Sequence, residues 1–172
     1  ETCVSPPSRE KNLTAKLGLD QDLIKSQTAV YSLENGGESL VTRAWLCENA
    51  QKTIDIQYYI FSRDNTGLVT CDYLVCAADR GVKIRLLVDD VTVQSGSNEI
   101  NALDSHENIE IRVYNPGIKV GRLGLRIKKM LTMPDKLHRR MHNKTITVDG
   151  EIAITGGRNI ADEYFDYHKS YN

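Results

Sequence analysis

A histidine and a lysine stand two residues apart in a segment that should be a β-strand. His142 and Lys144 begin the run 142–148, in which β-branched residues predict a strand. Side chains alternate along a strand, so both should project from one face. An imidazole can attack phosphorus and form a phosphohistidine, while a nearby ammonium stabilises the charged oxygens. The pair therefore predicts a phosphoryl-transfer site.

The segment after this strand should return to it. Asp149-Gly150 predicts a turn, and residues 151–155 predict a partner strand, which should bring Asn159 near His142. The amide of Asn159 would add a donor for phosphate oxygens. This chemistry predicts no cofactor. The irregular spacing of the remaining histidines (His106, His138 and His168) predicts no metal site.

The pattern HxKxxxxD, six residues and then GGxN resembles the signature of the phospholipase D superfamily, and it occurs once. Other segments resemble bacterial cardiolipin synthases, the enzymes that exchange phosphatidyl groups between lipids. These segments are Tyr58-Tyr59-Ile60 with Asp64 and Gly67, residues 77–82, Asp89-Asp90, residues 139–144, and Gly156–Ile160 with Glu163-Tyr164-Phe165.

The resemblance implies roles for individual residues. It implies that His142, Lys144 and Asp149 are catalytic, although Asp149 before Gly150 is also a typical turn residue. Phosphate contacts are implied for Lys144, Gly157 and Asn159, and Asn159 could equally cap a helix beginning at Ile160.

Two further implications concern the neighbours of this motif. The carboxylate of Glu163 could hydrogen-bond to the imidazole and so fix its orientation and tautomer. Many superfamily members carry serine where Gly157 stands, and glycine is usual in the synthase-like branches. We interpret Gly157 as a mark of the branch.

The resemblance also implies that the site needs a second motif. In the superfamily two copies face each other, so one copy supplies half a site. The second half should come from the same longer chain or from a homodimer. Because the segment ends at Asn172 without a closing strand or helix, we expect a longer natural chain and little activity from these residues alone.

For the whole enzyme we expect transfer of a phosphatidyl group, that is, phospholipid biosynthesis. The alternatives are a lipid hydrolase or a dimeric single-motif nuclease, and a third, non-enzymatic reading is a membrane-binding module. The basic segment 116–141 lacks the aromatic residues that stack on single-stranded nucleic acid, so nucleic acid is the less favoured partner.

Charge is balanced overall but concentrated locally. The chain has 22 basic and 23 acidic residues. Segment 116–141 carries eight basic residues against Asp135, interleaved with aliphatic side chains. Arg122, Arg126, Lys128 and Lys129 are thus candidate contacts with an anionic membrane. Without a spanning segment or signal in the sequence, we expect a peripheral protein at the inner membrane of the bacterial cell envelope.

The elements that must position the site predict an α/β fold with a mixed sheet flanked by helices. Residues 1–30 should be an irregular leader outside the core, with a helical turn near 17–24, and residues 31–172 the catalytic domain. Expected helices are 40–47, 68–79 and 98–103, and expected strands are 53–60, 82–88, 109–114, 142–148 and 151–155, with the catalytic strand interior.

The four cysteines form no close pair. Cys47, Cys71 and Cys76 fall in apolar helical patterns, where small buried thiols are common. The sequence therefore predicts neither a disulfide nor a metal role for them. The context of Cys3 is too short to predict lipidation.

Overall fold

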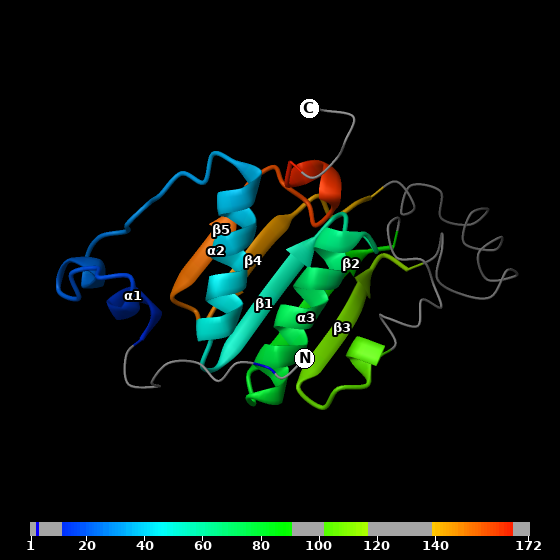
Figure 1. Cartoon of the computed structure of the whole chain (residues 1–172), viewed down its shortest axis with the longest axis horizontal. Helices are drawn as coiled ribbons and strands as arrows, with labels where there is room; N and C mark the ends of the chain where they lie inside the picture. The colour runs from blue at the N-terminus through cyan, green and yellow to red at the C-terminus, as the bar shows by residue number, and fades with distance from the viewer. Residues whose placement is uncertain (1–2, 4–11, 91–101, 117–138, 167–172) are drawn as a thin grey trace, which may run out of the picture.

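A five-stranded mixed sheet forms the centre of the molecule. The computed structural model describes residue 3 and residues 12–90, 102–116 and 139–166. Its strands are β1 (Thr53–Tyr58), β2 (Lys83–Asp89), β3 (Ile109–Tyr114), β4 (Lys144–Val148) and β5 (Ile152–Thr155), in the order β3-β2-β1-β4-β5 (Figure 1). β1, β2 and β3 run parallel, while β4 is antiparallel to both β1 and β5. The predicted α/β class is confirmed, and β4 is interior.

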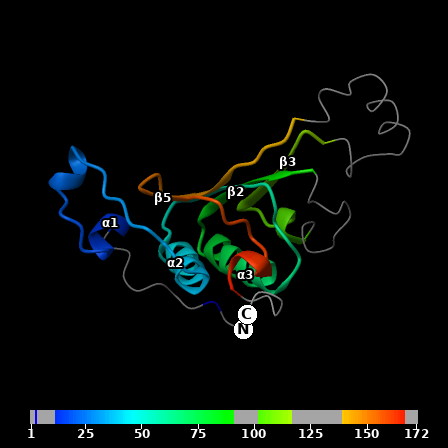
Figure 2. The same ribbon diagram turned by 90° about the horizontal axis from the view of Figure 1, so that it is seen from above.

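Two helices, α2 (Gly36–Asn49) and α3 (Asn65–Asp79), cover one face of the sheet, as Figure 2 shows. The sheet residues that face them are apolar and buried, and β1 contributes Ile54, Ile56 and Tyr58. Burial of this alternating stripe drives the sheet and helices together. No helix in the described ranges is long and apolar enough to cross a bilayer.

Helix α2 begins earlier than the periodicity predicts. Asn35 caps it by accepting a hydrogen bond from the backbone N–H of Glu38 at 2.7 Å, so the two glycines lie inside the first turn. A β-carbon on Gly36 would lie 2.5 Å from a carboxylate oxygen of Asp166. That carboxylate accepts a hydrogen bond from the Gly36 N–H at 2.7 Å, so the close approach requires glycine.

Helix α3 also begins earlier than predicted. Asp64 caps it through the N–H of Gly67 at 3.1 Å, and Gly81, with φ at 92°, follows its end. A β-carbon on Gly67 would clash with the carbonyl oxygen of Ser62. Only glycine fits this first turn against the preceding loop.

The strands match their predictions closely, and the short helical segments do not. Strand β3 has the predicted bounds, and the other strands differ by one or two residues. Residues 102–104 are helical, and the rest of the predicted helix 98–103 lies outside the described residues. The helix expected after Asn159 is a single 3-10 turn, η2 (Asp162–Tyr164).

The N-terminal segment packs on the domain, which corrects the prediction of a leader outside the core. Its helical turns are α1 (Leu13–Lys16) and the 3-10 turn η1 (Leu23–Lys25). Leu13 is fully buried within the main hydrophobic cluster. Leu13 belongs to a short apolar cluster with Leu17 and Leu19 that does not sustain a helical period, so the sequence pattern missed its burial.

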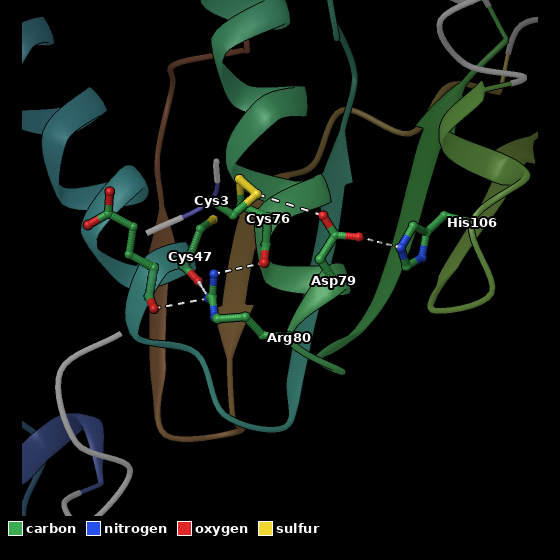
Figure 3. The surroundings of a disulfide bond; sticks show 7 residues. Cys3, Cys47, Cys76, Asp79, Arg80 and His106 are labelled. Carbon is green, nitrogen blue, oxygen red and sulfur yellow. Dashed lines mark hydrogen bonds and ion pairs between the residues drawn. A yellow bond between two sulfur atoms is a disulfide. The ribbon is translucent and has the colours of Figure 1, made fainter. Parts of the chain in front are cut away.

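A disulfide joins this segment to α3, and the prediction that the cysteines form none was wrong. Cys3 and Cys76 are bonded, with 5.3 Å between their Cα atoms. They are 73 residues apart in sequence, a separation at which spacing carries no pairing signal. Figure 3 shows the carboxylate of Asp79 between this disulfide and the ring of His106, whose Nε2 lies 3.2 Å from it.

Removing the disulfide should destabilise the protein, because the bridge closes a long loop in the unfolded chain. Cys76→Ser should lower the free energy of unfolding by about 2–4 kcal/mol, measured by denaturant titration. Reduction of the wild-type protein should have the same effect. Cys71→Ser, five residues before Cys76 in α3, is the matched control and should change stability little. Equal stability of Cys76→Ser and wild type would mean that the bridge does not form in solution.

Candidate active site

The site is organised at the end of β1 where it meets the start of β4. In the antiparallel register Tyr58 lies opposite Lys144, and the N–H of Tyr59 donates to the carbonyl of Asn143 at 3.0 Å. His142 therefore precedes the strand instead of beginning it, and its side chain is exposed. The strand is two residues shorter than the sequence predicts.

Lys144 is a buried cation. Its side chain is 6% exposed and lies at the end of the β4 stripe formed by Ile146 and Val148. The ammonium donates to the carbonyl of His142 at 3.0 Å, and no carboxylate in the described ranges pairs with it. Burial lowers the pKa of Lys144, because it penalises the charged form. An anion bound beside Nζ would relieve this penalty.

Tyr59 contacts both predicted residues. Its ring centroid is 4.8 Å from that of His142, with the planes tilted by 57°. The Lys144 ammonium lies 5.6 Å from the same centroid. Sequence analysis placed Tyr59 on a strand and assigned it no role, because its contacts arise beyond the last residue of β1, where periodicity no longer applies.

Asn159 reaches the same region from the other side. It is 2% exposed, and its side-chain oxygen accepts a hydrogen bond from the N–H of Ile60 at 3.1 Å. Ile160 pairs with the same segment through its N–H, which donates to the carbonyl of Ile60 at 3.1 Å. The return of the hairpin thus brings Asn159 to the residue after Tyr59. The side-chain oxygen of Asn159 accepts this hydrogen bond, and its side-chain nitrogen is the group that can donate to a ligand.

The arm that carries Asn159 is fastened to α3 by two carboxylates. Asp64 accepts from the N–H of Asp162 at 2.8 Å, and Asp162 accepts from the N–H of Thr66 at 2.8 Å. Burial alone would raise the pKa of Asp162, but hydrogen bonds from Thr66 and Asn65 outweigh it and lower that pKa. These two hydrogen bonds between Asp64, Asp162 and Thr66 connect the first turn of α3 to the segment that follows Gly156-Gly157.

Asp89 holds the chain on the other side of His142. It is fully buried at the end of β2, and its carboxylate accepts from the N–H of Met141 at 2.9 Å and pairs with Arg140 at 3.2 Å. The residues immediately before His142 are thereby fixed to the sheet. An acidic pair directly after an apolar strand was the sequence signal, and it suggested no role by itself.

Gly157 and Glu163 lie at the edge of this arrangement. Gly157 is exposed, and a β-carbon added there would meet nothing within 4 Å, so a serine would fit. Glu163 is exposed in η2, and among the described residues no hydrogen bond joins it to His142. The geometry therefore gives no support to Glu163 as the orienter of the imidazole.

Asp149 lies at the opposite end of β4 from Lys144, where its carboxylate makes structural contacts. Its carboxylate accepts hydrogen bonds from three successive backbone N–H groups, those of Gln51 (2.9 Å), Lys52 (2.7 Å) and Thr53 (2.9 Å). Its own φ is 55°. The motif aspartate fixes the turn between α2 and β1, and with it the start of the strand that leads to Tyr59.

The remaining predicted residues, Arg122, Arg126, Lys128 and Lys129, lie outside the described residues. Within the described ranges no three metal-binding side chains are grouped closely enough to hold a metal ion. The geometry does provide an exposed imidazole and a buried ammonium that contact the same tyrosine ring, with an oriented amide nearby. This set is suited to nucleophilic attack on phosphorus with stabilisation of the anionic oxygens.

Comparison with known proteins relates most of this chain to one family. A family model described as "Cardiolipin synthase, PLD-like domain" matches residues 46–172. Cardiolipin synthase C of Escherichia coli is 42% identical over 140 residues, which are 81% of this chain and 29% of that protein. The chain thus spans less than a third of this curated relative.

Solved structures show the same fold. NucT from Helicobacter pylori superposes with a TM-score of 0.56 at 17% identity, covering 76% of this chain and 72% of NucT. Nuc from Salmonella typhimurium, a phospholipase D family member, gives 0.50 at 22% identity, covering 74% of this chain and 68% of Nuc. At these identities the likeness concerns the fold alone.

Replacing Asp149 should lower the stability of the folded protein. Asp149→Ala removes the acceptor of three backbone N–H groups and should cost about 2–3 kcal/mol of unfolding free energy. Asp149→Asn is the matched control, because asparagine tolerates a positive φ and retains one acceptor oxygen. Chemical denaturation of both variants measures the effect. An Asp149→Ala variant as stable as wild type would contradict the structural role.

Replacing Lys144 should abolish binding of a phosphate analogue without destabilising the protein. The lowered pKa means that the ammonium opposes folding at neutral pH, a cost that disappears once the pH exceeds its ordinary value of 10.5. Lys144→Met should therefore melt no lower than wild type at neutral pH, and any gain should shrink at alkaline pH. Orthovanadate, a phosphate analogue, should raise the melting temperature of wild type but not of the variant.

The exposed Lys52, at the far end of β1, provides the control for this experiment. Lys52→Met should keep the stabilisation by orthovanadate. A large loss of stability in Lys144→Met at neutral pH would mean that the ammonium stabilises the folded protein. It would contradict the inference that the ammonium is buried at a cost because no carboxylate pairs with it.

Proposed function

Because the chain belongs to the PLD-like domain family of cardiolipin synthases, we propose that it contributes one half of a phosphatidyl-transfer site. The observation that carries this proposal is that one ring, that of Tyr59, contacts both the exposed His142 ring and the buried Lys144 ammonium, which lacks a carboxylate partner in the described ranges. Such a cation favours an anionic ligand at the point where the imidazole can attack.

The reaction proceeds by two displacements at phosphorus. A ring nitrogen of His142 attacks the phosphodiester of a phospholipid, forming a P–N bond while the bond to the leaving alcohol breaks. The leaving oxygen takes a proton from an acid. The hydroxyl of the acceptor, phosphatidylglycerol or a related alcohol, then attacks phosphorus, gives its proton to the same group, and releases His142. The product is cardiolipin or a relative.

Lys144 and Asn159 act on the charge that develops in these steps. The ammonium of Lys144 and the side-chain nitrogen of Asn159 donate to the non-bridging oxygens, and backbone groups beside Gly157 complete the contacts. Lys144 carries its charge in a site with few water contacts, where electrostatic stabilisation is stronger than in water. These donors stabilise the trigonal bipyramidal state more than the substrate.

The acid that serves the leaving alcohol belongs to a second motif. This chain contains one HxKxxxxD sequence and spans 29% of the matched synthase from Escherichia coli. We therefore assign the second histidine to another part of a longer polypeptide, with a second copy of this chain as the alternative source. In either arrangement the exposed side of His142 faces the partner half.

A location in the bacterial cell envelope, peripheral to the inner membrane, follows from the lipid substrate. The Cys3–Cys76 disulfide adds a side to this proposal, since disulfides persist in oxidising compartments and are rare in reducing ones. We place the domain outside the cytoplasm, with the basic segment 116–141 as its contact with anionic lipid.

The test uses the complete natural polypeptide with vesicles containing phosphatidylglycerol. Wild type should form cardiolipin, and His142→Ala should lose at least about a thousandfold in rate, as expected when a nucleophile is removed. His106→Ala, a histidine paired with Asp79 away from the site, should retain activity. An acid-labile phosphorylated intermediate should be trapped on wild type and His106→Ala but not on His142→Ala.

Two outcomes would overturn the proposal. Cleavage of single-stranded DNA without any action on the vesicles would make the protein a nuclease of the same superfamily. Vesicle binding without turnover of either substrate would make it a binding module.

A further inference from the structure

We propose that Tyr59 is the positioning residue of the site, holding the His142 imidazole and the Lys144 ammonium in place through one aromatic ring. The inference rests on the proposed function and adds a residue to it. It is drawn from the contacts of Tyr59, which meets both groups, and from the way the backbone fixes Tyr59 itself.

The imidazole needs such a support. His142 precedes the first residue of β4, and its side chain is exposed, so neither the strand ladder nor core packing limits its rotamers. No described residue forms a hydrogen bond with the His142 ring. The contact with Tyr59, at 4.8 Å between centroids and a tilt of 57°, falls within the geometry of favourable aromatic pairs. It restricts the ring while leaving both nitrogens accessible.

This mode of orientation differs from that of a carboxylate. A carboxylate that orients a histidine hydrogen-bonds to one nitrogen and so occupies it. An aromatic ring holds the imidazole by its face and edge. One nitrogen is then available to phosphorus, and the other remains available to a group supplied by the second half of the site.

The same ring also contacts the cation. The Lys144 ammonium lies 5.6 Å from the Tyr59 centroid, within the range of a cation–π interaction. Attraction to the ring keeps the ammonium near the imidazole although no carboxylate in the described ranges holds it. The distance between nucleophile and cation is therefore set by their common neighbour.

Tyr59 is itself held from both sides by the backbone. Its N–H donates to the carbonyl of Asn143 at 3.0 Å, on the His142 side. The next N–H, that of Ile60, donates to the side chain of Asn159 at 3.1 Å, and the Ile60 carbonyl accepts from Ile160. The two-residue segment 59–60 thus links His142, Lys144 and Asn159. A ring on this segment has little freedom to drift from its contacts.

The experiment compares three variants in the complete natural polypeptide. Tyr59→Leu removes the ring but keeps an apolar side chain, Tyr59→Phe keeps the ring, and Tyr73→Leu removes a half-buried tyrosine of α3 as the matched control. The kcat and KM of phosphatidyl transfer are measured for each. Thermal melting is recorded for every variant, and rates are compared at temperatures where all are folded.

We expect Tyr59→Leu to lose about 10- to 100-fold in kcat with little change in KM, since misplacement of a reacting group costs rate more than binding. Tyr59→Phe should stay within about threefold of wild type, because the ring contacts survive. Tyr73→Leu should keep wild-type kcat. The NMR signals of the His142 ring protons should lose their ring-current shift in Tyr59→Leu and keep it in Tyr59→Phe.

Other results would overturn the inference. A Tyr59→Leu enzyme with wild-type kcat would show that the ring is dispensable, and a Tyr59→Phe enzyme as slow as Tyr59→Leu would assign the role to the hydroxyl group. Failure of the proposed function is distinguishable from both, because wild type would then show no transfer that depends on His142.

Discussion

The antiparallel pairing of β1 with β4 is the constraint from which the site follows. It places Tyr58 opposite Lys144, and its continuation beyond both strands joins Tyr59 to Asn143. A slip of one residue would turn Lys144 to the other face of the sheet. The apolar residues Ile54, Ile56, Ile146 and Val148 prevent this slip, because they must all face the helices. Packing of the core therefore fixes the register of β1 and β4, and with it the positions of the candidate site residues at the end of these strands.

The site combines ordinary packing with a charge that the fold does not neutralise. Buried cations in proteins are normally paired, and Lys144 has no carboxylate in the described ranges. Instead it has a carbonyl oxygen and an aromatic face. These partners are weak enough to be displaced or supplemented by a phosphate. An anion bound beside the ammonium would offset the cost of burying it.

Sequence patterns were sufficient wherever local periodicity and burial agree. The alternation in 53–58 and 109–114 defined strands, and the spacing of His142, Lys144 and Asn159 defined the candidate site. Contacts between distant segments gave no such signal. The bridge from Cys3, the burial of Leu13 and the anchoring of Met141 by Asp89 depend on tertiary placement. For Asp149 the motif suggested chemistry, whereas its three backbone contacts assign it to a turn.

The disulfide determines how mechanical load would pass through the domain. A pull applied to the chain at residue 3 enters α3 at Cys76, near the C-terminal end of that helix. The connection from α3 to the Asn159 arm lies in the first turn of the helix, where Asp64 and Asp162 exchange hydrogen bonds. The intervening turns of a packed helix are stiff and share the load. Tension applied at residue 3 would thus act on α3 before it reached the strands that lead to His142 and Lys144.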